Sequence, residues 1–98
     1  MDETVEAVVR GRVQGVGFRY FAQREAVVLG LTGWVANEPD GSVRCVAVGP
    51  RAIVEAFIER LREGPPSALV DRVELSWRPG SSAAYTSFGV RSGAHRGD

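Results

Sequence analysis

The residues best suited to chemistry lie in the segment 13–19, which reads Val-Gln-Gly-Val-Gly-Phe-Arg. Gly15 and Gly17 allow backbone conformations that other residues avoid, so successive amide N–H groups can point into one concavity. A helix is predicted to begin at Phe18, and its first turn adds unpaired N–H groups and the positive end of a helix dipole. The segment therefore predicts a backbone cradle for an anion the size of phosphate.

Arg19 falls in the first turn of that predicted helix, from which its guanidinium can reach over the same concavity. A guanidinium offers a planar fork of donors that matches a phosphoryl group. The alternative interpretation is a plain tight turn followed by a solvated arginine. The segment lacks the Gly-Lys-Ser/Thr of a Walker loop and the third glycine of a Rossmann motif, so nucleotide binding by either route is not expected.

Asn37 is the second candidate, at the end of a predicted strand just before a turn. Its carboxamide both donates and accepts hydrogen bonds, so it could hold a water molecule for in-line attack on a bound phosphoryl group. An asparagine there could equally be a turn residue that satisfies nearby backbone groups. The neighbouring Glu38 and Asp40 are interpreted as hairpin residues rather than acid or base catalysts.

Composition excludes several other kinds of chemistry. The 98 residues include twelve arginines, no lysine and twelve acidic residues, so the formal net charge is zero and no field over the whole molecule favours nucleic acid or membrane. Without lysine, Schiff-base chemistry is excluded. The single cysteine, Cys45, and the single histidine, His95, form no metal-ligand pattern, and His95 lies in a polar tail where no catalytic role is expected. We therefore expect no cofactor and no metal.

The same features suggest a compartment. A lone cysteine is typical of a reducing, cytoplasmic setting. The N-terminus begins with acidic residues rather than a basic and apolar leader, and no apolar run approaches the roughly 20 residues of a membrane span. Neither secretion nor membrane insertion is expected.

The candidate residues must be positioned by the elements around them. Val5, Ala7 and Val9 alternate with more polar neighbours, as in a strand with one buried face, whereas apolar residues after Phe18 recur at helical spacing until Gly30. The expected elements are a strand at 4–10, a helix at 18–29, strands at 31–37 and 42–48 joined by a turn at 38–41, a helix after Pro50 that ends before Gly64, a strand at 72–78 and a short strand at 85–91.

This order, βαββαβ plus a short fifth strand, predicts an α+β fold of the ferredoxin-like type. It would be a two-layer α/β sandwich with a mostly antiparallel sheet and two helices on one face. Residues 1–91 are expected to form one domain, and residues 92–98 a flexible C-terminal tail. Many unrelated functions use this fold, so function has to be argued from the site.

Three segments together resemble the acylphosphatase family. Residues 11–19, Gly-Arg-Val-Gln-Gly-Val-Gly-Phe-Arg, are similar to its signature, and residues 30–37 with 39–43 are similar to its second motif. Gly64-Pro65-Pro66 followed by residues 70–73 resembles a later segment of the family. The match runs in consistent order over roughly residues 4–91, which is more specific than one glycine loop.

The resemblance implies a metal-free enzyme that hydrolyses small acyl phosphates to a carboxylate and inorganic phosphate. It implies that Arg19 is the catalytic arginine that binds phosphate and that Asn37 orients the attacking water. The implied phosphate cradle consists of the amides of Gln14, Gly15, Val16, Gly17, Phe18 and Arg19. No nucleic-acid or membrane partner is implied, and a cytoplasmic monomer is expected.

Two alternatives remain. A ferredoxin-like module could bind RNA or protein, but an RNA reader of this fold needs aromatic residues on its central strands, and residues 4–10 and 42–48 contain none. A domain of this family could also bind phosphate without hydrolysis, or serve a larger carbamoyl-transfer assembly. Because both Arg19 and Asn37 are present, we favour a free-standing enzyme.

Smaller expectations concern packing. Cys45 is expected to share one sheet face with Val43 and Ala47, as a packed thiol rather than a nucleophile. Trp34 and Trp77 are expected to pack, and Glu25 is expected to form an ion pair at the edge of the first helix. Exposed Val27 and Val28 raise the prospect of a weak self-contact, and Arg91 is expected to help anchor the C-terminus.

Overall fold

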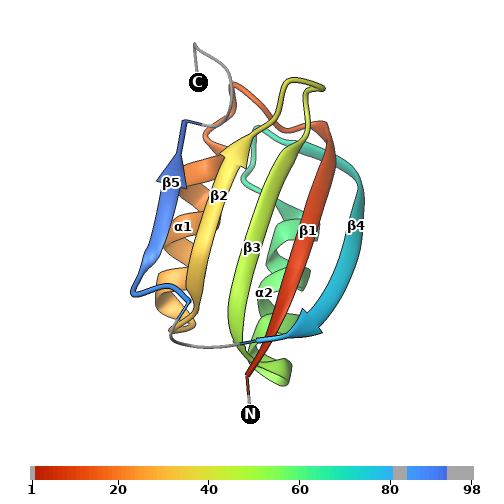
Figure 1. The fold of residues 1–98 in the computed structure, drawn as a ribbon. Coiled ribbons are helices and arrows are strands. Elements are labelled where there is room, and N and C mark those ends of the chain that lie inside the picture. The colour runs from red at the N-terminus through yellow and green to blue at the C-terminus, as the bar shows by residue number, and fades with distance from the viewer. Residues whose placement is uncertain (1, 81–83, 93–98) are drawn as a thin grey trace.

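The computed structural model describes residues 2–80 and 84–92, and its elements follow the predicted order (Figure 1). The elements are β1 (Asp2–Arg12), α1 (Phe18–Val28), β2 (Thr32–Asn37), β3 (Val43–Pro50), α2 (Arg51–Glu63), β4 (Leu69–Pro79) and β5 (Phe88–Arg91). His95 and the predicted tail from residue 93 lie outside the described residues.

The five strands form one sheet in the order β4-β1-β3-β2-β5. β1 pairs antiparallel with β3 and β4, β2 pairs antiparallel with β3, and β5 pairs parallel with β2. Both helices lie on the same face of this sheet (Figure 1). The predicted ferredoxin-like arrangement is confirmed, and it places the ends of β1, β2 and β5 and the start of α1 at one edge, at the top of Figure 1.

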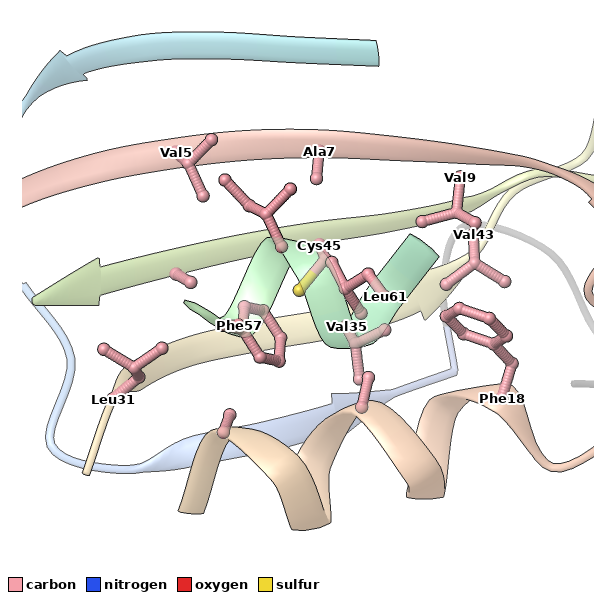
Figure 2. Close-up of a cluster of buried hydrophobic side chains, with 14 of the residues drawn as sticks. Val5, Ala7, Val9, Phe18, Leu31, Val35, Val43, Cys45, Phe57 and Leu61 are labelled. Carbon is pink, nitrogen blue, oxygen red and sulfur yellow. The ribbon is translucent and has the colours of Figure 1, made fainter. Parts of the chain in front are cut away.

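The core lies between the sheet and the helices (Figure 2). Val5, Ala7 and Val9 of β1 are each 0% exposed, as their alternation predicts. α1 buries Phe18, Ala22 and Ala26 in the same core, mainly against β2 and β5, and α2 buries Val54, Phe57, Ile58 and Leu61. Full burial of a valine, leucine or phenylalanine side chain contributes about 1.5–3 kcal/mol each. The packing of both helices on the sheet therefore stabilises the edge that carries the candidate site.

Two smaller predictions about packing are confirmed. Cys45 is buried in the core cluster with Val43 and Ala47 (Figure 2). Glu25 of α1 forms an ion pair with Arg60 of α2, which links the two helices at the edge of the core.

The first strand is longer than predicted. The predicted strand ends at residue 10, yet β1 continues through Gly11 to Arg12, with a register shift after Arg10. Gly11 has a φ of 134°, and a Cβ there would lie 2.2 Å from the Leu69 carbonyl oxygen. A glycine bulge therefore extends the pairing, and β4 begins at Leu69 rather than at residue 72.

Candidate active site

The glycine-rich turn between β1 and α1 has the backbone conformation that the sequence predicts. Gly15 and Gly17 have φ values of 75° and 78°, and a Cβ would meet nothing within 4 Å at either position. Glycine is therefore required for conformation rather than for space.

The start of α1 is open to an anion. Gly17 caps the helix without a side-chain hydrogen bond, and the first turn holds no acidic residue. The first helical hydrogen bond runs from the Phe21 amide to the Gly17 carbonyl, 3.0 Å. Among the described residues, no amide of residues 14–19 donates any of the backbone hydrogen bonds found in loops and turns. These N–H groups are therefore available to a bound ligand.

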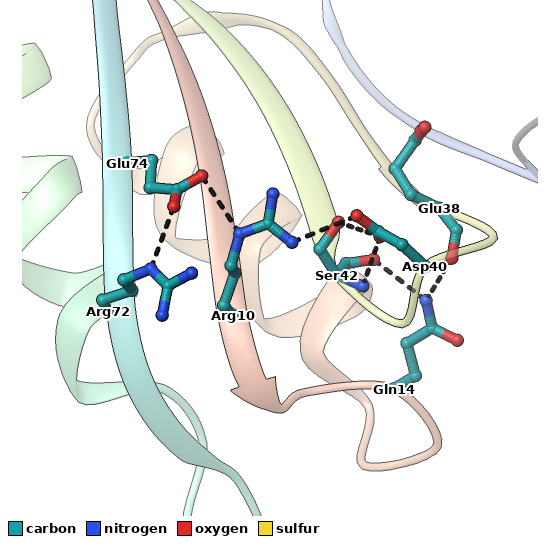
Figure 3. A network of polar contacts seen from close by, with 7 residues as sticks. All are labelled: Arg10, Gln14, Glu38, Asp40, Ser42, Arg72 and Glu74. Atoms are coloured by element: carbon teal, nitrogen blue, oxygen red, sulfur yellow. Dashed lines mark hydrogen bonds and ion pairs between the residues drawn. The ribbon is translucent and has the colours of Figure 1, made fainter.

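The side chain of Gln14 fastens this loop to the β2–β3 hairpin (Figure 3). Its Nε2 donates to the Glu38 carbonyl oxygen at 2.8 Å and to the Ser42 carbonyl oxygen at 2.9 Å. From the sequence, only the backbone amide of Gln14 is expected to take part in the site. No sequence signal identifies this contact, because the two carbonyls lie 24 and 28 residues further along the chain.

The hairpin is held in shape by Asp40. Its Oδ1 accepts hydrogen bonds from the Ser42 amide at 2.9 Å and the Ser42 hydroxyl at 2.6 Å, and Arg10 lies 3.1 Å from Oδ2 (Figure 3). These contacts, with the Ser42 hydroxyl contributing most, lower the pKa of Asp40 from 3.8 to about 2. Asp40 therefore stabilises the turn that follows Asn37, which agrees with its interpretation as a hairpin residue.

Arg19 projects from the first turn of α1 toward β5. Its Nη1 donates to the Arg91 carbonyl oxygen at 3.0 Å. Arg91 is the parallel partner of Ala36, the residue before Asn37. A continuous series of contacts therefore places Arg19 beside the end of β2 that carries Asn37. Within residues 2–80 and 84–92, Arg19 forms no ion pair, so its remaining donors are unoccupied by carboxylates.

Asn37 ends β2, where it pairs with Val43. It is 8% exposed, and within the described part of the chain its carboxamide has no hydrogen-bond partner. In that part of the chain, Nε of Arg44 is the side-chain polar atom that is both fully buried and without a hydrogen-bond partner. The carboxamide of Asn37 also lacks a partner but does not belong to this class, because it retains contact with solvent. It is held in place by its strand and is free to bind a water molecule.

Arginine side chains lie against both tryptophan rings, Trp34 on β2 and Trp77 on β4. The guanidinium of Arg91 lies 4.5 Å from the centre of the Trp34 ring, and that of Arg44 lies 5.9 Å from it. Arg51 lies 3.6 Å from the Trp77 ring centre. Both tryptophans therefore pack against arginines, as expected of packing residues.

Comparison with known proteins decides the family. The family model described as acylphosphatase matches residues 5–90, which include the loop, Arg19 and Asn37. The chain belongs to the acylphosphatase family. An acylphosphatase of Thermus thermophilus is 49% identical over 84 residues, which cover 86% of this chain and 93% of that protein.

Solved structures of the family have the same fold. The crystal structure of acylphosphatase from Bacillus subtilis matches with a TM-score of 0.87 at 36% identity, covering 91% of this chain and 98% of that one. The fold also occurs within a much longer protein: HypF of T. kodakarensis matches with a TM-score of 0.80 at 36% identity, over 92% of this chain but 12% of HypF. The chain is thus an enzyme of the acylphosphatase class, whose relatives of similar length are acylphosphatases.

The described residues contain no group of three or more histidine, cysteine, aspartate or glutamate side chains that could hold a metal ion. None of the helices in that part of the chain is long and apolar enough to cross a membrane.

Proposed function

We propose that this acylphosphatase hydrolyses small acyl phosphates by direct attack of water on phosphorus, with Arg19 and Asn37 as its catalytic residues. The observation that carries the proposal is the contact series that joins the two residues. Arg19 binds the carbonyl of Arg91, Arg91 pairs with Ala36, and Asn37 comes next. The open glycine loop adjoins both through α1 and through the side chain of Gln14.

The phosphoryl group binds in the cradle of amides from Gln14 to Arg19. Arg19 contributes a bidentate contact through donors that its bond to the Arg91 carbonyl leaves unused. The phosphoryl-transfer transition state spreads charge over the equatorial oxygens, and fixed amides with a guanidinium stabilise that charge without reorganisation. No covalent enzyme intermediate is needed.

Asn37 orients the nucleophile. Its carboxamide accepts a hydrogen bond from a water molecule and aligns its oxygen with phosphorus, opposite the acyl oxygen. A bond forms between the water oxygen and phosphorus, the bond between phosphorus and the acyl oxygen breaks, and the electron pair leaves with the carboxylate. The proton of the water passes to the phosphate product or to solvent.

The leaving group explains why the site needs no general acid. A departing carboxylate has a conjugate acid with a pKa of about 4, as for side-chain carboxyl groups, so it leaves as an anion at neutral pH. Positioning of the water and stabilisation of charge then suffice, so the proposed reaction needs neither a histidine nor a thiol.

Hydrolysis of benzoyl phosphate in water enriched in oxygen-18 tests this mechanism. We expect the label in inorganic phosphate and not in benzoate, because the bond to phosphorus is the one that breaks. Inorganic phosphate should inhibit competitively, since it occupies the same cradle. Label in benzoate would show attack at the acyl carbon and would contradict the proposal.

A further inference from the structure

A groove lies between the glycine loop and the segment that leads into β4. Its volume is about 620 Å³, and eight described residues line it. Gln14, Gly15 and Val16 belong both to this groove and to the proposed phosphate cradle. The opposite wall comes from the segment between α2 and β4 and from the first residue of β4, including Pro66 and Leu69. A group attached to a phosphoryl group in the cradle can therefore enter it.

The groove has an apolar wall and one cationic group. Leu69 is 63% exposed, and Val16 and Pro66 extend the apolar surface beside it. Among the described residues that line the groove, Arg12 is the only charged one. Arg12 is the antiparallel partner of Leu69, so both side chains rise on the same face of the sheet.

Arg12 is unlike most arginines of the chain. Most described arginines form ion pairs with carboxylates, among them Arg10, Arg44, Arg51, Arg60, Arg62, Arg72 and Arg78. Within the described ranges Arg12 forms none, although it lies only two residues from Arg10, which contacts two. Its position depends on the Gly11 bulge, which carries β1 past its regular register.

From this placement we propose that the groove is the subsite for the acyl group, and that it selects acyl phosphates whose acyl chain ends in a second anionic group. The methylene chain would cover Leu69 and Val16, and the terminal carboxylate would bind the guanidinium of Arg12. This inference rests on the proposed function, because it needs the phosphoryl group to bind in the loop.

The test compares two substrates with the same six-carbon chain, adipoyl monophosphate and hexanoyl phosphate, which differ in the terminal carboxylate. For the wild-type protein we expect a higher kcat/KM for the adipoyl substrate. Arg12→Gln should lower kcat/KM for adipoyl monophosphate about tenfold, mainly through KM, because a charge-assisted contact is lost. The kcat/KM for hexanoyl phosphate should stay within about twofold of the wild-type value, since Arg12 does not stabilise the transition state at phosphorus.

Arg24→Gln is the matched control, because Arg24 is an exposed arginine of α1 without an ion pair among the described residues, and its loss changes the net charge equally. It should leave the ratio between the two substrates unchanged. In the Arg12→Gln background, Leu69→Arg should restore part of the preference, because it returns a cation to the same wall.

Three results would overturn the proposal. These are a wild-type protein without preference for the adipoyl substrate, an Arg12→Gln protein with the wild-type ratio, or an equal change in Arg24→Gln, which would indicate long-range charge alone. The proposed function fails separately, if the wild-type protein hydrolyses neither substrate. Circular dichroism of each variant, with hexanoyl phosphate turnover as internal control, separates loss of selectivity from loss of folding.

Discussion

At the scale of single residues, the candidate site is small: one guanidinium, one carboxamide and a set of amides. Arg19 and Asn37 could both be selected from the sequence, because a guanidinium after a glycine loop and a carboxamide at a strand end are residue types suited to a phosphoryl group and its water. The contacts that hold Arg19 and Asn37 in position could not be predicted in this way. The partner of Arg19 is a backbone carbonyl 72 residues away.

Arg19→Lys should lower kcat at least about 100-fold, because a single ammonium group cannot reproduce a bidentate contact with the phosphoryl group, and loss of an oxyanion donor costs on the order of 10²–10³-fold. Steady-state hydrolysis of benzoyl phosphate measures this effect. Arg24→Lys makes the same substitution at an exposed position of the same helix and should leave kcat unchanged. Near-normal turnover by the Arg19→Lys protein would mean that Arg19 contributes only charge.

Asp40 makes stability depend on pH. Its pKa in the folded protein is about 2, against an ordinary 3.8, so the folded state holds the proton less tightly than the unfolded state. The stabilisation is therefore complete above pH 4 or so and is lost as the pH falls from about 4 through 2. Asp40→Asn should lower the free energy of unfolding at pH 7 and should flatten the acid decline in this window.

Urea denaturation at several pH values between 2 and 7 measures the effect of Asp40. Asp71→Asn serves as control, because Asp71 is an exposed carboxylate of β4 without an ion pair among the described residues. An acid decline equally steep in wild type and Asp40→Asn would contradict the assignment.

At the scale of elements, the site depends on how the glycine loop, the β2–β3 hairpin and β5 are fastened to one another. Local sequence predicts each element well, since alternation, helical spacing and turn residues are local properties. The sequence could not predict that β5 receives Arg19, that the Gln14 side chain bridges loop and hairpin, or that β1 continues through the Gly11 bulge. These features depend on pairing between distant segments, which no local pattern encodes.

Gln14→Glu should uncouple the loop from the hairpin. Glutamate has nearly the same shape, but its carboxylate cannot donate to the carbonyls of Glu38 and Ser42 and would face them with like partial charge. We expect kcat/KM for benzoyl phosphate to fall about tenfold or more. The free energy of unfolding should fall by about 1–2 kcal/mol, the usual range for lost hydrogen bonds of this kind.

Gln23→Glu is a suitable comparison, because Gln23 makes an analogous bond from α1 to the Phe88 carbonyl, 3.0 Å, away from the glycine loop. It should cost similar stability and less activity. If both variants lost activity in proportion to stability alone, Gln14 would have no specific part in positioning the site.

At the scale of the whole molecule, the ferredoxin-like fold was predictable because the apolar pattern marks the order of strands and helices and the buried faces of β1 and both helices. Most residues that the pattern selects on β1, α1 and α2 are buried in the core, and Cys45 of β3 packs with them at 1% exposure. The family also follows from motifs spread along the chain, which together match residues 5–90.

Cys45 reports on the integrity of this core. Burial raises the pKa of its thiol well above the ordinary value, and the thiolate is the reactive form. Iodoacetamide should therefore leave the folded protein unmodified and fully active, and should label it stoichiometrically in urea above the unfolding transition. Mass spectrometry after timed exposure measures the label. Rapid labelling of a fully active native protein would contradict the packing of β3 described above.

The central claim is that Arg19 and Asn37 perform different steps at one site, and turnover measured together with phosphate binding tests it most directly. Wild type, Arg19→Ala and Asn37→Ala, each checked for folding, would be assayed with benzoyl phosphate in excess EDTA, with inorganic phosphate as inhibitor. We predict metal-independent turnover by wild type and at least about 100-fold loss in both variants, with phosphate inhibition retained in Asn37→Ala and weakened in Arg19→Ala. Near-normal turnover by either folded variant would contradict this assignment.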